Sequence, residues 1–136
     1  MTRRVFWILF LASLTLTLGL KAASEGWFTA RTPLPLNGQP ALVFFTLSKG
    51  CDCQMTVVRA AEAQLADWVS PLPLYRVDFD RRHDLAEQFG VARAPALVLV
   101  NAEGQVVWKQ DEGLSDGSPL DLNQAERQVE ALTGNP

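Results

Sequence analysis

The sequence has few of the residues that build metal centres and disulfide scaffolds. Its 136 residues include two cysteines and one histidine. Two cysteines are too few for a disulfide scaffold. His83, the single histidine, lies in no metal-ligand pattern such as H-x-x-E-H or E-x-x-H. No serine lies in a nucleophile motif that His83 could serve as the base. The glycines form no phosphate-binding loop. The sequence also lacks internal repeats. The fold must therefore depend on an apolar core, and any chemistry on very few side chains.

Positive charge is also scarce. The chain has 12 basic and 15 acidic residues, a net charge of −3. Three of the basic residues, Arg3, Arg4 and Lys21, lie near the N-terminus, so the chain beyond residue 24 carries 9 basic and 15 acidic residues, a net charge of −6. Such a surface suits neither nucleic acid nor anionic lipid. We expect no nucleic-acid partner, and contact with a membrane only through the N-terminal segment if it is uncleaved.

The sequence has one long hydrophobic run, at residues 5–20. Arg3 and Arg4 precede it and small residues follow it, which is the pattern of a secretory signal. Sixteen residues rise about 24 Å as a helix, less than the roughly 30 Å of a bilayer core. If the helix is extended through Ala23, its length comes closer to the thickness of the bilayer core. Lys21, at the end of the apolar run, weakens the best cleavage site. Residues 1–24 are therefore predicted to be a signal peptide or an N-terminal membrane anchor. Either places the rest of the chain outside the cytoplasm, in the periplasm or secreted, where a disulfide can persist.

The remaining sequence alternates between strand and helix patterns. Residues 25–40 contain three prolines, which predicts a linker, with a possible edge strand at residues 27–30. Beyond it, apolar periodicity predicts strands at 41–47, 74–79, 96–100 and 105–109, and helices at 52–69, 83–89 and 119–132. This order predicts one α/β domain over residues 41–136, with a mixed central sheet covered by helices on both faces.

Both cysteines lie where the first buried strand gives way to a helix, in the sequence Cys51-Asp52-Cys53. A helix N-terminus stabilises a thiolate. Cα atoms two residues apart lie near the disulfide range of about 4.4–6.8 Å, so the pair can close in a bent turn. A three-residue loop stabilises a fold by only about 1.6 kcal/mol before strain is subtracted. Reactivity therefore explains the pair better than stability, although the carboxylate of Asp52 disfavours a thiolate.

A second motif, Phe89-Gly90-Val91-Ala92-Arg93-Ala94-Pro95, leads into a wholly apolar strand. Together with the cysteine pair at the start of a helix, it resembles the thioredoxin family over about residues 41–132. The resemblance implies a thioredoxin-like three-layer α/β/α sandwich that exchanges disulfides with protein or small-molecule thiols through Cys51 and Cys53. It also implies that Pro95 follows a cis peptide bond, lies against the cysteines and keeps metals from the sulfurs, and that the backbone of Ala94 pairs with substrate. We expect no organic cofactor, no metal and a monomer.

The sequence departs from the family's W-C-x-x-C pattern. Gly50 occupies the place of the first cysteine, Lys49 that of the tryptophan, and Phe44 that of a buried aspartate. Efficient general reduction of protein disulfides is therefore in question. Within the pair, we expect Cys51, as the more exposed sulfur, to attack a substrate and Cys53, deeper in the helix, to resolve the mixed disulfide.

Three alternatives to a redox enzyme stay open. The domain could be a non-catalytic module that binds a partner in the cleft expected between the cysteines and Pro95. The cysteines could be an inert local bridge or two buried thiols. Finally, Cys51, Cys53 and Met55 form a compact set of sulfur ligands, and thiolates and thioethers favour Cu(I).

Overall fold

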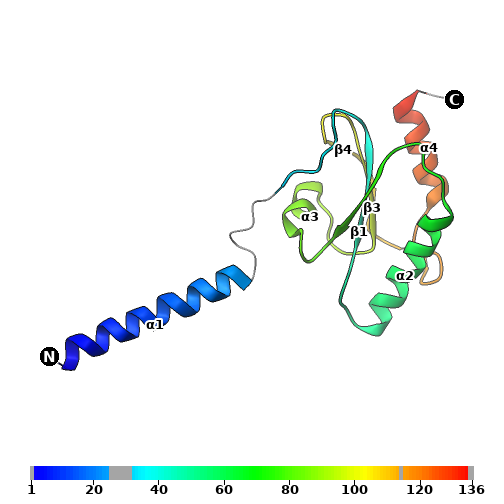
Figure 1. The fold of residues 1–136 in the computed structure, drawn as a ribbon. Helices are drawn as coiled ribbons and strands as arrows, with labels where there is room; N and C mark the ends of the chain where they lie inside the picture. The colour runs from blue at the N-terminus through cyan, green and yellow to red at the C-terminus, as the bar shows by residue number, and fades with distance from the viewer. Residues whose placement is uncertain (1, 25–31, 114, 135–136) are drawn as a thin grey trace. The chain divides into compact units, whose positions relative to one another are not determined.

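The computed structural model describes residues 2–24, 32–113 and 115–134. The chain divides into two compact units, Met1–Pro33 and Leu34–Pro136, both of which are drawn in Figure 1. The possible edge strand at residues 27–30 lies outside the described residues.

The first unit contains a single helix, α1 (Thr2–Ser24). Its 23 residues rise about 34 Å, and the hydrocarbon core of a bilayer is about 30 Å thick. Most of its large apolar side chains are exposed. The hydroxyls of Thr15 and Thr17 donate to main-chain carbonyls three and four residues earlier, at 2.9–3.0 Å, which satisfies them inside the helix. By length and composition alone, Arg3–Ser24 could cross a membrane, and a signal sequence has the same properties.

The second unit is built on a four-stranded sheet. Its strands are β1 (Ala41–Thr46), β2 (Leu74–Asp78), β3 (Ala96–Val100) and β4 (Val106–Gln110), in the spatial order β2-β1-β3-β4. β1 and β2 are parallel, whereas β3 is antiparallel to both of its neighbours. A parallel pair needs a long crossover, and here α2 (Asp52–Asp67) supplies it. The inner strands are apolar and almost wholly buried, as expected for strands covered on both faces.

Helices cover the two faces of the sheet, as Figure 1 shows: α3 (His83–Phe89) lies on one side, and α2 and α4 (Leu122–Thr133) lie on the other. Successive strand residues point to opposite faces, so each inner strand contributes to two cores. The core under α3 includes Val43, Phe45, Val98, Leu85 and Phe89. The core under α2 and α4 includes Leu42, Phe44, Leu97, Leu99, Ala61, Leu65, Ala125 and Val129. The predicted thioredoxin-like α/β/α sandwich with a mixed sheet is confirmed.

The compact unit begins earlier than the predicted domain. Leu34 and Leu36 pack against the core under α3, and the hydroxyl of Tyr75 donates to the carbonyl of Pro35 at 2.9 Å. Asn37 and Gly38 adopt positive φ angles of 52° and 70° in the turn that leads to β1. Residues 34–40, predicted to lie in the linker, therefore belong to the folded domain, because their apolar side chains cover part of the sheet.

Capping explains where several elements end. Gly90 closes α3 with a left-handed φ of 65°, so the helix ends at Phe89 as predicted. α4 begins at Leu122 rather than at residue 119, because the carboxylate of Asp121 accepts the N–H of Gln124 at 2.9 Å. α2 ends at Asp67, two residues before the predicted end, with extended backbone at Trp68.

Candidate functional site

The two sequence motifs leave the sheet at the same end. Phe45, next to last in β1, pairs with Ala96, the first residue of β3, and Thr46 pairs with Asp78 at the end of β2. The cysteine turn follows Thr46, and Ala94-Pro95 immediately precedes Ala96. Antiparallel pairing of β1 and β3 therefore directs the cysteine turn and the proline loop to one edge of the domain.

Cys51 is the N-cap of α2. Its backbone is extended, with φ −67° and ψ 160°, and its Sγ accepts the N–H of Gln54 at 3.5 Å. In return, Oε1 of Gln54 accepts the N–H of Cys51 at 3.3 Å, which completes a reciprocal capping box. Serine, threonine, aspartate and asparagine usually fill the cap position. In this helix the Sγ of Cys51 takes that place. It accepts the hydrogen bond from Gln54 and lies at the positive end of the helix dipole.

Cys53 lies in the first turn of α2, two residues after the cap. Hydrogen bonding from its thiol and from the backbone N–H of Gln54 holds the pKa of Cys51 below its ordinary value. Hydrogen bonding to Cys51, then burial and the negative charge of Cys51, raise the pKa of Cys53. Cys51 is therefore the more easily ionised of the two thiols. Both cysteines are free and exposed.

Ala94 and Pro95 are half-buried, and the peptide bond between them is cis. The loop before them is tied to the segment after β4. Nε of Arg93 donates to the carbonyl of Asp111 at 2.9 Å, and the guanidinium of Arg93 lies 3.2 Å from the carboxylate of Glu112. Among the described residues, no hydrogen bond or ion pair joins Ala94 or Pro95 to either cysteine. The structure places the two motifs at one end of the sheet without a polar link between them.

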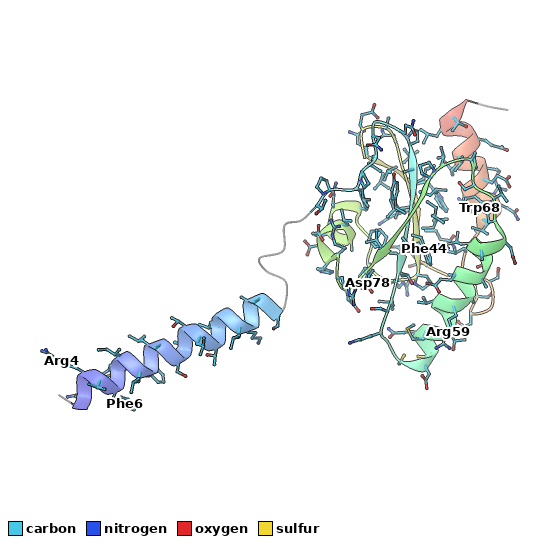
Figure 2. The ribbon with its side chains drawn as sticks, in the orientation of Figure 1. Arg4, Phe6, Phe44, Arg59, Trp68 and Asp78 are labelled. Atoms are coloured by element: carbon cyan, nitrogen blue, oxygen red, sulfur yellow. The ribbon has the colours of Figure 1, made fainter. Side chains whose placement is uncertain are left out.

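The three residues that depart from the W-C-x-x-C pattern and its buried aspartate lie in different surroundings. Phe44 is fully buried in the core under α2 and α4, between the sheet and the helices in Figure 2, so this position holds no carboxylate. Lys49 is exposed. Gly50 lies against Gln54, because a Cβ at residue 50 would be 3.0 Å from Oε1 of that side chain.

Sequence reasoning did not find three of the polar residues around this edge. Gln54 could have been found from its spacing, three residues after the cap, had cysteine been counted as a capping residue. Glu62 of α2 accepts the hydroxyl of Thr46 at 2.9 Å. Asp78 accepts the N–H groups of Asp80 and Arg81 at 3.1 and 3.0 Å, and no sequence signal distinguishes it from a solvated carboxylate.

The remaining candidate ligands are arranged as follows. The described residues contain no group of three or more His, Cys, Asp or Glu side chains that could hold a metal ion. His83 is exposed, pairs with Glu87 at 3.4 Å and meets the ring of Phe79 edge-on, as expected of a surface residue. Met55 is half-buried, with its Sδ 3.5 Å from the position of a Cβ at Gly50. Its thioether therefore lies near the cysteine turn rather than deep in the core.

No protein-family model matches the sequence, and no curated protein matches it significantly. Among solved structures, a variant thioredoxin from Halobacterium salinarum is 20% identical, with 71% of this chain and 77% of that chain covered and a TM-score of 0.49. A Fasciola hepatica thioredoxin is 19% identical, with 70% and 82% covered and a TM-score of 0.47. The reduced thioredoxin pre-protein of Schistosoma mansoni is 13% identical, with 69% and 79% covered and a TM-score of 0.46. The fold assignment rests on this chain's own strand order and layers.

Proposed function

We propose that this thioredoxin-like domain is an extracytoplasmic thiol–disulfide oxidoreductase whose redox centre is Cys51 and Cys53. One observation carries the proposal: an exposed sulfur, that of Cys51, caps α2 and accepts the N–H of Gln54, and the second exposed cysteine follows two residues later in the first turn of the same helix. Thiol–disulfide exchange requires such a pair, one sulfur that ionises readily and a second within reach.

In the direction of substrate reduction, the thiolate of Cys51 attacks one sulfur of a substrate disulfide. The substrate S–S bond breaks, a mixed disulfide forms, and the departing substrate thiolate takes a proton from water. Cys53 then passes its proton to water and attacks Sγ of Cys51, which closes the Cys51–Cys53 disulfide and releases the second substrate thiolate, which takes up a proton from water. Two electrons pass from the cysteine pair to the substrate. The same steps in reverse oxidise a dithiol substrate.

Ala94 and Pro95 are proposed to form the substrate-binding side of this centre. An extended peptide that carries a disulfide would pair its backbone with that of Ala94 while Pro95 bounds the cleft. The support for this role is that both loops leave the sheet at the same end. Substituting Ala94 with proline removes its N–H and should weaken peptide substrates while leaving a small disulfide such as oxidised glutathione unaffected.

We further propose that α1 exports the domain, either as a cleaved signal or as a retained anchor. Its length and its run of exposed apolar side chains support this role, and Arg3 and Arg4 at its start favour leaving that end in the cytoplasm. Cell fractionation and the mass of the mature chain separate the two cases. A domain found only in the cytoplasm would overturn the proposal.

Trapping of partners tests the central claim. A Cys53→Ser variant lacks the resolving sulfur and should accumulate mixed disulfides with partners, which migrate as adducts on non-reducing gels and disappear with dithiothreitol. A Cys51→Ser variant is the matched control and should form none. Absence of adducts from both variants, together with retained partner binding, would favour a non-catalytic binding module. The midpoint potential of the Cys51/Cys53 couple, compared with that of glutathione, gives the direction of electron flow.

The position of Met55 keeps one alternative function worth testing, namely Cu(I) handling. Thiolates and thioethers are the ligands that Cu(I) prefers, and the sulfur of Met55 lies near the turn that carries both cysteines. Titration of the reduced protein with Cu(I) in the presence of a competing chelator should then show one-to-one uptake. That uptake should weaken in a Met55→Leu variant, whereas trapping of mixed disulfides should not.

A further inference from the structure

We propose that Gln54 is a positioning residue for Cys51, and that Gly50 is needed because it leaves space for the Gln54 side chain. This inference rests on the proposed function, since it concerns how the attacking sulfur is held. It also accounts for the glycine that stands in the place of the first cysteine in W-C-x-x-C.

The hydrogen bonds at the start of α2 make Cys51 and Gln54 a closed pair. The backbone N–H of Gln54 donates to Sγ of Cys51, and the side-chain carbonyl of Gln54 accepts the backbone N–H of Cys51. The side-chain bond holds the backbone of Cys51 in the extended conformation that directs its sulfur over the helix end. Without that bond, the backbone of residue 51 can rotate, and its sulfur can leave the N–H of Gln54.

Gly50 is the neighbour that this pair depends on. A Cβ on residue 50 would meet Oε1 of Gln54 at 3.0 Å, the β-carbon of Gln54 at 3.5 Å and Sδ of Met55 at 3.5 Å. The amide oxygen would then have to move by a few tenths of an ångström. Its bond to the N–H of Cys51 is already 3.3 Å long, beyond the usual 2.7–3.2 Å for such bonds. A side chain at residue 50 should therefore break the bond without any change in the core.

This competition links two departures from the family pattern. The Cβ of a cysteine at residue 50 would lie 3.0 Å from the amide oxygen of Gln54, so that this amide would have to shift. With glycine at that position the amide of Gln54 stays in place, and the sulfur of Cys51 caps the helix. Substituting Gly50 with cysteine should consequently not restore an ordinary W-C-x-x-C centre, because the added side chain displaces Gln54 from Cys51.

The pH dependence of Cys51 alkylation tests the inference. The reduced full-length chain in detergent is incubated with iodoacetamide at a series of pH values, and the modified Cys51 peptide is quantified by mass spectrometry. Gln54→Ala should move the midpoint for Cys51 upward by about 0.5 unit, because loss of the positioning bond weakens the cap on the thiolate. Gly50→Ala should give a similar shift. Thr56→Ala is the matched control. Thr56 is an exposed residue of the same helix, and its hydroxyl donates to the carbonyl of Asp52. This substitution should not shift the midpoint for Cys51.

A double-mutant comparison separates the claimed link from two independent effects. If Gly50 acts by leaving space for Gln54, Gly50→Ala should add almost nothing to the shift already present in Gln54→Ala. Additive shifts would overturn the role given to Gly50. An unchanged midpoint in Gln54→Ala would overturn the positioning role of Gln54. If the melting temperature of that variant also fell, Gln54 would act only as a helix-capping residue that stabilises the fold. Mixed-disulfide trapping by Cys53→Ser can succeed or fail independently of this midpoint, so the two proposals fail separately.

Discussion

The hydroxyl of Thr46, the last residue of β1, donates to the carboxylate of Glu62 in α2 at 2.9 Å, and the bond is partly buried. It joins the helix that begins with the cysteines to the strand from which the cysteine turn departs. The relationship is a direct polar contact between the sheet and the helix that presents the sulfurs. It should therefore contribute to the stability of the domain.

Thr46→Val removes the donor and retains the shape of the side chain. Because a hydrogen bond to a charged group contributes roughly 1.5–3 kcal/mol and this one is only partly buried, we expect the free energy of unfolding to fall by about 1–2 kcal/mol. Urea denaturation of the domain measures it. Thr46→Ser keeps the donor and should lose less than half as much, and equal losses in the two variants would show that the contact is not the cause.

The two cysteines should be alkylated in a fixed order. Hydrogen bonding from Cys53 and from the N–H of Gln54 lowers the pKa of Cys51, whereas the bond to Cys51 and burial raise the pKa of Cys53. Below the usual thiol pKa of about 8.5, Cys51 should therefore hold more thiolate and react first with limiting iodoacetamide. Peptide mapping after labelling at pH 6–8 measures the amounts of the peptides alkylated at Cys51 and at Cys53. Equal labelling, or Cys53 labelled first, would contradict the assignment of Cys51 as the nucleophile.

Asp78 should make the domain sensitive to acid. Burial opposes its charge, but hydrogen bonds from Ser48, Arg81 and Asp80 outweigh burial and lower its pKa. A carboxylate with a lowered folded-state pKa stabilises the fold above its unfolded pKa of about 3.9, and that contribution is lost as the pH falls through the folded-state pKa.

Asp78→Asn keeps an oxygen acceptor and removes the charge. It should therefore be less stable than the wild type by up to about 1 kcal/mol near pH 6, because the group is partly solvated. The difference should shrink below pH 4. Denaturation curves at both pH values measure it, and a difference that does not depend on pH would rule out the charge as its origin.

Phe44 should tolerate little change. It is fully buried beneath α2 and α4, and removing a buried phenylalanine side chain costs about 3–5 kcal/mol. Phe44→Ala should reduce the free energy of unfolding by that amount, and Phe44→Asp by more, because it also buries a carboxylate. Val106→Ala on the exposed edge strand is the control and should cost under about 0.5 kcal/mol. A stable Phe44→Asp variant would show that this position in the core can accept a carboxylate.

The sequence predicts most of the architecture but little of the polar detail of the site. Ala96–Val100 and His83–Phe89 are predicted to the residue, because Pro95 and Gly90 bound them and their apolar patterns are unambiguous. The end of α2 and the start of α4 are less well predicted, because they depend on which side chain closes the helix. The contact between Thr46 and Glu62 depends on how α2 lies against β1, and periodicity carries no information about it.

The inner position of β1 and β3 determines how the site responds to thermal fluctuation. The cysteine turn and the proline loop both start from strands that are hydrogen-bonded on both sides and buried on both faces. Partial unfolding usually begins at edges and termini and reaches such strands last. Amides of β1 and β3 should therefore exchange with deuterium only on global unfolding. The cysteine turn and the proline loop would then keep their spacing while β2 and β4 open and close around them.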